Sequence, residues 1–441
     1  IALLGAGLWF SIRLGFIQVR GFGESMRRTF GGLFSKKGKA GKDGMSSFQA
    51  LATAIAAQVG TGNIAGVAGA ITIGGPGAVI WMWMSALLGM CTKYSEVTLA
   101  VHFREKNSQG DWVGGPMYYI KNGLSKHWHW LAFLFSLFGV LTVFGTGNAT
   151  QVNTIVTAID SLMLNFNLAS SGSLSTINLV IGIVIAIAVA LILIGGIRRI
   201  GKVTETLVPF MAFLYLILGL GVVLLNIQHV PAVFRSIFEG AFHPAAFSGG
   251  MVGSLFTSMK KGVSRGIFSN EAGLGSAPIA TATVKSNDPI RQGLVAMTST
   301  FFGTVIICSL TGLCVVLTGA WKENLMGISI ADYAFTKGLP FPSIVCSLLI
   351  LLCIICFAFT TIIGWNLYGV KCLDYLTKGN VKIQKIYNWL YILMVFIGAF
   401  LKIDLIWNLA EIINALMAIP NLIAILFLTN DIAKDTNLYF K

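Results

Sequence analysis

The stretch Ala56-Ala57-Gln58-Val59-Gly60-Thr61-Gly62-Asn63 interrupts an apolar run that extends from about Phe48 to Ile73. Two glycines that flank a threonine in the middle of a membrane span favour a break in the helix. In hydrocarbon each freed backbone N–H or C=O costs several kcal/mol, so a break persists only where it lines a protein cavity or binds a ligand. The stretch therefore predicts half of a site for a substrate and a cation.

The composition places the chain in a membrane. Of its 441 residues 55% are hydrophobic and 11% charged, and the mean hydropathy is +0.79, whereas a soluble protein carries about 25% charged residues. The net charge of +14 is expected to reflect cytoplasmic loops rather than nucleic-acid binding. The sequence contains neither a histidine cluster nor a Walker motif, so we expect no enzyme, no cofactor and no ATP-driven transport.

Apolar runs of roughly 20 residues predict about eleven transmembrane helices. They are centred on residues 1–19, 48–73, 78–101, 131–159, 177–197, 207–227, 249–268, 295–320, 344–370, 386–401 and 405–429. The densest basic stretch, residues 20–42, follows the first span and is therefore expected to face the cytoplasm. This predicts a multi-pass protein of the cell membrane, with its N-terminus outside and its C-terminus in the cytoplasm.

A second interruption is expected in the seventh span, where small, polar and charged residues follow an apolar start over residues 250–262. Discontinuous helices at corresponding places of two halves indicate an inverted-repeat transporter with its site near the bilayer midplane. The predicted organisation is an extra N-terminal helix with a basic cytoplasmic loop (1–45), a first five-helix repeat (46–227), an extracellular linker (228–248), a second five-helix repeat (249–430) and a cytoplasmic tail (431–441).

The first break has a chemistry of its own. A helix that ends near Gly60 presents free carbonyls to a cation, and a helix that begins near Asn63 presents free N–H groups to a carboxylate. Together they suit a zwitterion that travels with Na⁺. The side chain of Asn63 adds a hard oxygen ligand.

Other polar residues within the spans have two interpretations each. The adjacent Thr360 and Thr361 either bond their own i−4 carbonyls or ligate the cation. Asn148 and Gln151 in the fourth span either hold helices together or face the pocket.

Three charged residues also lie at membrane depth or close to it. Lys93 and Glu96 are expected to form a structural i,i+3 pair rather than a proton relay. Glu271 is expected to cap a cytoplasmic helix or to serve a gate.

Four stretches resemble the alanine/glycine:cation symporter family, which belongs to the amino acid–polyamine–cation superfamily. They are Gln58–Asn63, Gly74-Gly75-Pro76-Gly77-Ala78, Gly114-Gly115-Pro116-Met117-Tyr118-Tyr119 and, most specifically, Arg265-Gly266-Ile267-Phe268-Ser269-Asn270-Glu271-Ala272-Gly273-Leu274-Gly275-Ser276-Ala277-Pro278. The resemblance implies an all-α membrane protein of the LeuT-type fold. It also implies Na⁺- or H⁺-coupled uptake of small neutral amino acids, alanine and glycine foremost. An amino-acid sensing receptor or a channel on a transporter scaffold is the alternative.

The similarity to sodium-coupled LeuT-type transporters also implies ligand positions. The substrate carboxylate would lie at Gly60, Thr61 and Gly62, with Phe256 and Met259 as pocket walls. One Na⁺ site would comprise the carbonyls of Ala56, Val59 and Phe357 with the hydroxyls of Thr360 and Thr361, and a second cation site Gln58, Asn63 and Thr257. This chain departs from that pattern at Lys260 and Lys261, which stand where small apolar residues are usual.

We add Gln151 and Trp365 as further substrate-binding candidates. With Phe256 and Met259, the bulk of Trp365 would leave room for little more than a methyl side chain. Exclusion by volume would then favour alanine and glycine over leucine, and both alanine enantiomers would fit.

Overall fold

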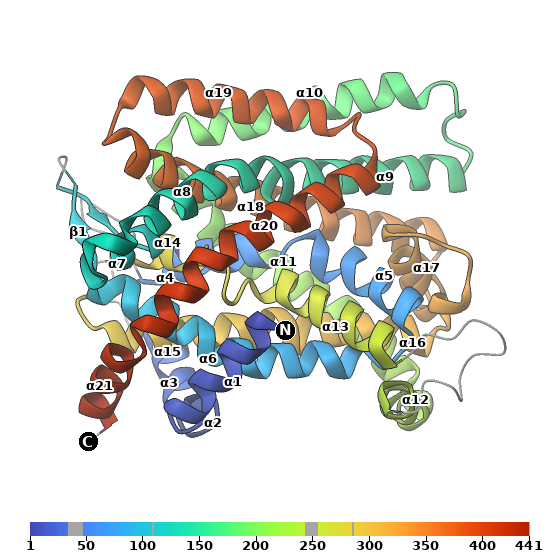
Figure 1. Cartoon of the computed structure of the whole chain (residues 1–441). Helices are drawn as coiled ribbons and strands as arrows, with labels where there is room; N and C mark the ends of the chain where they lie inside the picture. The colour runs from blue at the N-terminus through green and yellow to red at the C-terminus, as the bar shows by residue number, and fades with distance from the viewer. Residues whose placement is uncertain (34–46, 108–109, 243–254, 285, 441) are drawn as a thin grey trace.

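The structure is a computed structural model that describes residues 1–33, 47–107, 110–242, 255–284 and 286–440 (Figure 1). These residues are almost entirely helical. A two-stranded antiparallel hairpin joins Glu105–Lys106 (β1) to Trp112–Val113 (β2).

The first half contains α1 (Ala2–Arg13), α2 (Ile17–Arg20), α3 (Phe22–Leu33), α4 (Ser47–Gln58), η1 (Thr61–Asn63), α5 (Ala65–Gly74), α6 (Ala78–His102), α7 (Pro116–Gly123), η2 (Lys126–Trp128), α8 (His129–Phe144), η3 (Gly145–Ala149), α9 (Thr150–Asn165), α10 (Leu174–Leu193) and α11 (Gly196–Leu225). The second half contains η4 (Ile227–His229), α12 (Val230–Phe242), α13 (Leu255–Asn270), α14 (Ala277–Thr281), α15 (Pro289–Thr300), η6 (Phe301–Cys308), α16 (Ser309–Leu317), η7 (Ala320–Lys322), α17 (Ile328–Gly338), α18 (Ser343–Thr377), α19 (Val381–Gly398), α20 (Ile403–Phe427) and α21 (Thr429–Phe440).

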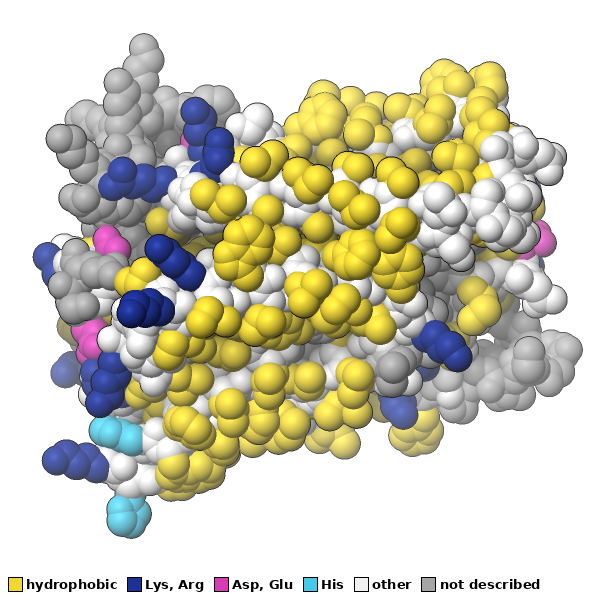
Figure 2. Space-filling view, turned by 90° about the horizontal axis from the view of Figure 1, so that it is seen from above, with side chains coloured by type: hydrophobic (Ala, Val, Ile, Leu, Met, Phe, Trp, Pro, Cys, Tyr) yellow, Lys and Arg dark blue, Asp and Glu magenta, His cyan; other side chains and the backbone are white. Residues whose placement is uncertain are grey.

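Among the described residues, six helices are long and apolar enough to cross a membrane, or seven if the bent pair α4–α5 counts as one span. The other expected spans correspond to α1, α6, α13 and α19. Of these, α1 and α13 are short, with 12 and 16 residues, and α6 and α19 carry charged residues. A broad apolar surface lies between the two ends on the face that Figure 2 shows, as expected of a protein whose sides face lipid.

The first break lies where the sequence predicts it. Helix α4 ends at Gln58, the single turn η1 follows, and α5 leaves at an angle of 59° to α4.

The second break differs from the expectation. Helix α13 continues through Phe256, Thr257 and Met259, and the chain departs from the helix only at residues 271–276. Here Glu271, Gly273 and Gly275 adopt positive φ values of 52°, 88° and 78°. Residues 249–254, where the interrupted span was expected to begin, lie outside the described residues.

Close helix packing explains the small residues that suggested the earlier break. A Cβ on Gly262 would lie 2.3 Å from the carbonyl oxygen of Ala78 and 2.7 Å from the Cβ of Trp81. The small residues of α13 therefore let its backbone approach α6, as at other membrane helix contacts. The expected extracellular linker is also partly helical, since α12 occupies residues 230–242.

One end of the molecule carries the hairpin, α7 and α21, and the opposite end carries α12 and α17 (Figure 1). Most of the Lys and Arg side chains visible in Figure 2 gather at one end.

Arg104, between α6 and β1, ties two segments together at the hairpin. Its guanidinium donates to the carbonyl oxygens of Ala282 (3.1 Å), Val284 (2.5 Å) and Ser286 (2.8 Å), beyond the second break, and lies 4.2 Å from the ring centroid of Trp112.

We expect Arg104→Lys to destabilise the protein, because an ammonium group cannot reproduce the planar fork of donors. Hydrogen bonds from a charged group contribute about 1.5–3 kcal/mol, so the thermal midpoint in detergent should fall by several degrees. Lys106→Ala is the matched control, because Lys106 lies over the same ring at 5.3 Å but is exposed. Equal thermal midpoints for Arg104→Lys and the wild type would contradict the proposed role of this fork.

Candidate substrate and cation site

A small buried cavity lies between the two breaks. The residues that line it come from α4, η1, η3, α9, α18, the end of α13 and the second break: Ala57, Gln58, Gly60, Gly62, Asn63, Thr146, Gln151, Phe268, Glu271, Thr361 and Trp365. The cavity thus joins the first break, the second break and the threonine-bearing helix α18.

Gly60 and Gly62 are needed for close approach. A Cβ on Gly60 would lie 2.6 Å from the hydroxyl oxygen of Thr361, and one on Gly62 would lie 2.7 Å from the ring of Phe268. A larger residue at either position would push these side chains out of the cavity.

Gln151 lines the cavity and also links two helices. Its carboxamide oxygen accepts hydrogen bonds from the backbone N–H of Thr61 (3.1 Å) and from the Thr61 hydroxyl (2.9 Å). Its Nε2 donates to the carbonyl oxygen of Thr146 (3.0 Å) in the π-helical segment η3. Asn148 also links two helices, since its Nδ2 donates to the carbonyl oxygen of Tyr391.

The two threonines of α18 fit both interpretations at once. Each hydroxyl donates to its own i−4 carbonyl, Thr360 to Cys356 and Thr361 to Phe357, at 2.9 Å. The hydroxyl of Thr361 also reaches the carbonyl oxygen of Ala56, 2.9 Å away on α4.

These contacts bring four of the five expected Na⁺ ligands together. The hydroxyl of Thr360 also donates to the carbonyl oxygen of Phe357, at 3.0 Å, so both threonine hydroxyls bond to this carbonyl. Val59, the fifth, is fully buried one residue beyond the end of α4. All five groups offer oxygen atoms, which hard cations prefer.

A second polar group surrounds Asn63. Its Nδ2 donates to Ser269 Oγ (3.0 Å) and to the carbonyl oxygen of Gly303 (3.1 Å), and Ser269 Oγ lies 2.9 Å from Thr304 Oγ1. The Oδ1 of Asn63 is buried and has no hydrogen-bond partner among the residues that the structure describes. Gln58, on the same side, exchanges hydrogen bonds with Ser299.

The structure does not bring Phe256, Thr257 or Met259 to this cavity. Phe256 is 71% exposed, Met259 lines a separate, larger cavity between α1, α13 and α20, and Thr257 lies against Gly74. The sequence pattern predicts these residues at the site because it indicates a second break about three helical turns before the position that the structure shows. Phe268 and Ser269 occupy the corresponding places.

Phe268 lines both cavities, so its ring separates the buried cavity from the larger one. The ring lies 5.0 Å from that of Trp407 on α20. Arg265 lies 4.7 Å from the Trp407 ring centroid and forms an ion pair of 3.0 Å with Glu411. Aromatic and ionic contacts therefore link α13 to α20 beside the cavity.

Sequence reasoning missed Phe268, Ser269 and Thr304 as site residues. The signal for the first two was present, because Gly273 and Gly275 in the adjoining motif mark a chain that leaves the helix. Thr304 lies in η6, a π-helical segment that no apolar periodicity reveals.

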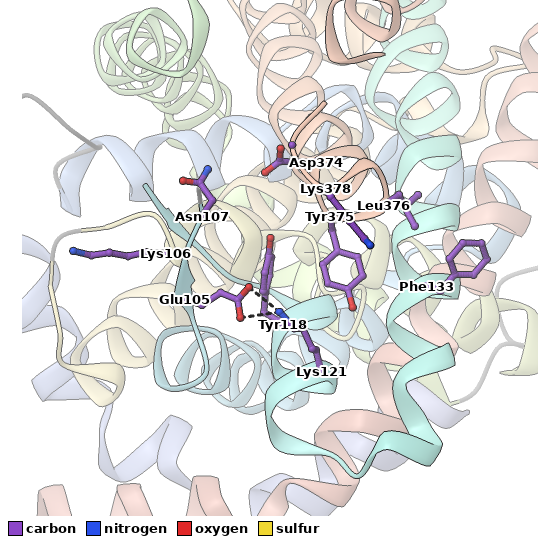
Figure 3. Close-up of a pocket in the computed structure, with 11 residues that line it drawn as sticks. Glu105, Lys106, Asn107, Tyr118, Lys121, Phe133, Asp374, Tyr375, Leu376 and Lys378 are labelled. Atoms are coloured by element: carbon purple, nitrogen blue, oxygen red, sulfur yellow. Dashed lines mark hydrogen bonds and ion pairs between the residues drawn. The ribbon is translucent and has the colours of Figure 1, made fainter. Parts of the chain in front are cut away.

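A further pocket opens at the surface near the hairpin (Figure 3). Its charged residues are of mixed sign, and Lys121 forms an ion pair of 2.9 Å with Glu105 while Lys106 points away. None of its lining residues belongs to either break, so we do not assign it to the substrate.

Comparison with known proteins finds similar proteins over the whole chain. The profile of the sodium:alanine symporter family matches residues 1–441. An uncharacterised transporter of Haemophilus influenzae is 47% identical over 100% of this chain and 92% of its own length. The sodium/alanine symporter AgcS of Methanococcus maripaludis is 39% identical over 100% of this chain and 93% of its own length. A probable sodium/glutamine symporter of Bacillus subtilis is 35% identical over 97% of this chain and 86% of its own length.

Among solved structures, MhsT in complex with L-phenylalanine superposes with a TM-score of 0.62 at 13% identity, over 90% of this chain and 93% of that one. A Na⁺-coupled sialic acid symporter gives a TM-score of 0.55 at 11% identity, over 95% of this chain and 85% of that one. At such identities the likeness establishes the fold alone, which is the expected all-α LeuT type. The family match covers the whole chain and its relatives are transporters rather than enzymes, so the chain belongs to the sodium:alanine symporter family.

Proposed function

We propose that this protein couples Na⁺ influx to the uptake of small neutral amino acids, alanine and glycine, by alternating access. The observation that carries the proposal is the carboxamide oxygen of Gln151 on the N–H and hydroxyl of Thr61. Two donors that converge on one oxygen atom at a helix break are suited to a carboxylate.

In this proposal the substrate carboxylate takes the place of the Gln151 oxygen. The N–H groups of Thr61 and Gly62 lie at the beginning of the second half of the broken helix, where the helix dipole favours negative charge. A carboxylate accepts a stronger hydrogen bond than a neutral amide does. The exchange therefore favours substrate over the internal contact.

Na⁺ is proposed to bind between α4 and α18, held by the carbonyls of Ala56, Val59 and Phe357 and the hydroxyls of Thr360 and Thr361. A second cation position is proposed at Gln58 and Asn63, supported by the buried, unpartnered Oδ1 of Asn63 within the described residues. Ser269 and Thr304 replace Thr257 there.

Substrate size follows from the walls. The indole of Trp365 is 1% exposed and donates to the carbonyl of Ala57 at 3.1 Å, so it is fixed in place. Because Phe268 also lines this small cavity, we infer that it admits at most a hydrogen or a methyl side chain, without selection between alanine enantiomers. The relatives differ in this respect, since their names range from alanine to glutamine.

The proposed inverted repeats, residues 46–227 and 249–430, are interleaved, since α6 packs against α13 and α15, and α8 against α18 and α20. Alternating access would therefore move groups of helices drawn from both repeats. The end that carries the hairpin and α7 is proposed to face the cytoplasm, since Arg104, Lys106, Lys121 and Lys126 lie there. The site would then be reached from outside past Phe268 and from the cytoplasm along α4.

We expect purified protein in proteoliposomes to accumulate alanine when an inward Na⁺ gradient is imposed, because Thr361, a proposed Na⁺ ligand, also lines the cavity proposed for the substrate. Labelled alanine uptake with and without the gradient is the measurement. Uptake driven only by a proton gradient would overturn the Na⁺ assignment. Flux without coupling would indicate a channel, and binding without flux a sensing receptor.

We expect Gln151→Glu to weaken alanine binding by at least about tenfold, because a fixed carboxylate would hold the Thr61 donors and repel the substrate carboxylate. Gln151→Ala removes the competing oxygen and should have a smaller effect. Alanine binding to both variants, with a thermal midpoint for each, makes the comparison. Equal affinities for the two variants would argue against a carboxylate at Thr61.

We expect Thr361→Ala to raise the Na⁺ concentration for half-maximal uptake by about tenfold, the equivalent of one charged hydrogen bond. Thr360→Ala should act in the same direction but less, because the Thr360 hydroxyl bonds to carbonyls of its own helix, α18, and to Met211 rather than to α4 among the described residues. Thr361→Ser keeps the hydroxyl and serves as the control.

A different outcome would favour the purely structural interpretation of these hydroxyls. In that case both alanine variants would lose thermal stability and would lose Na⁺ and alanine affinity to the same extent.

A further inference from the structure

Three charged residues, one of which lines the cavity, are buried and have no role in the binding proposed above. Lys93 and Glu96 on α6 are 0% exposed, and Glu271 in the second break is 2% exposed. Burial of unpaired charge is costly, so each charge needs a partner.

Glu96 is fixed to the second break. Its Oε1 accepts hydrogen bonds from the backbone N–H of Gly275 (3.0 Å) and from Nδ2 of Asn421 (2.5 Å). Tyr119 in turn donates to the side chain of Asn421. Glu96 therefore holds the chain of the second break, and it does not line the cavity.

Lys93 lies within the fields of both carboxylates, Glu96 and Glu271. Its Nζ makes no hydrogen bond within the part of the chain that the structure describes, and neither does Oε2 of Glu96. With one ammonium and two carboxylates, the cluster carries a net charge of −1 when all three are ionised.

Glu271 is the member of the cluster that reaches the cavity. It is the one ionisable residue among the described residues that line it, together with Gly60, Gly62 and Gln151. Its Oε2 accepts from the hydroxyl of Ser276 at 2.6 Å. Its φ of 52° is a conformation that glycine adopts at lower cost, so local backbone preference does not explain a glutamate here.

We propose that Glu271 receives the α-ammonium group of the transported amino acid, while Lys93 and Glu96 neutralise each other behind it. This inference rests on the proposed amino-acid symport. The carboxylate of the substrate lies at Thr61 and its ammonium group at the second break, so both broken helices hold one molecule. One added positive charge makes the buried cluster neutral.

The test compares alanine with propionate, which has the same carboxylate and carbon chain but no ammonium group. The readout is the ratio of their half-inhibitory concentrations against labelled alanine in proteoliposomes. This ratio does not depend on the amount of folded protein. In Glu271→Gln, which keeps the size of the side chain, the ratio of propionate to alanine should fall by at least about tenfold, the value of one lost charged hydrogen bond.

Two double variants separate the position of the carboxylate from the charge of the cluster. Lys93→Met with Glu96→Gln and Lys93→Met with Glu271→Gln each leave one carboxylate and a net charge of −1. The double variant Lys93→Met with Glu96→Gln should keep the ratio near that of the wild type. Glu271 remains in it, and the side-chain oxygen of a glutamine at position 96 can still accept from the N–H of Gly275. The double variant Lys93→Met with Glu271→Gln should show the same lowered ratio as Glu271→Gln alone.

Other outcomes overturn the inference. An unchanged ratio in Glu271→Gln would exclude an ammonium contact. A proton-coupled component of wild-type uptake that Glu271→Gln abolishes, with an unchanged ratio, would make Glu271 a proton site, and a change confined to Na⁺ affinity would make it a cation ligand. Failure of the underlying function is distinguishable, because the wild type itself would then show no Na⁺-driven alanine uptake.

Discussion

The structure depends on one constraint, which is that backbone groups freed inside an apolar slab must find partners. At the first break the N–H of Thr61 is taken by Gln151, the carbonyl of Ala57 by the Trp365 indole (3.1 Å), and the carbonyl of Asn63 by the Thr311 hydroxyl (2.8 Å). These partners come from α9, α18 and α16, far away in sequence. The break therefore gathers the surrounding helices around it, and its partners are the groups with which a ligand competes.

The two breaks are satisfied by different chemistry. At the first break the freed backbone groups are hydrogen-bonded by neutral side chains, namely an amide, an indole and a hydroxyl. Such neutral contacts are suited to exchange with a zwitterion or a cation. The second break is held by the carboxylate of Glu96 on the N–H of Gly275 and by Asn421 on the carbonyl of Gly273 (2.9 Å). Charged hydrogen bonds at full burial are the stronger kind. The first break is thus suited to ligand exchange, and the second to holding the cavity wall in a fixed shape.

The sequence predicts the fold class, the first break and the threonine pair, because each leaves a local signature. Gly60 and Gly62 stand in an apolar run, and Thr360 and Thr361 are adjacent polar residues in another. The position of the second break could not be derived in the same way. Small residues such as Gly262 serve close packing against α6 as readily as they would serve a break, and Glu271 adopts a left-handed φ without being glycine. Which small residues pack and which unwind is decided by the neighbouring helix.

The two π-helical segments orient two amide side chains at the first break, that of Gln151 and that of Asn63. A π turn carries an extra residue and leaves carbonyl groups outside the regular i→i−4 pattern. In η3 the carbonyl of Thr146 accepts from Nε2 of Gln151, and in η6 the carbonyl of Gly303 accepts from Nδ2 of Asn63. Each segment thus orients one amide side chain, and that side chain directs its oxygen away from the π turn. For Gln151 this oxygen lies on the Thr61 donors, so an irregularity in α8–α9 places the group that the proposed substrate carboxylate would displace.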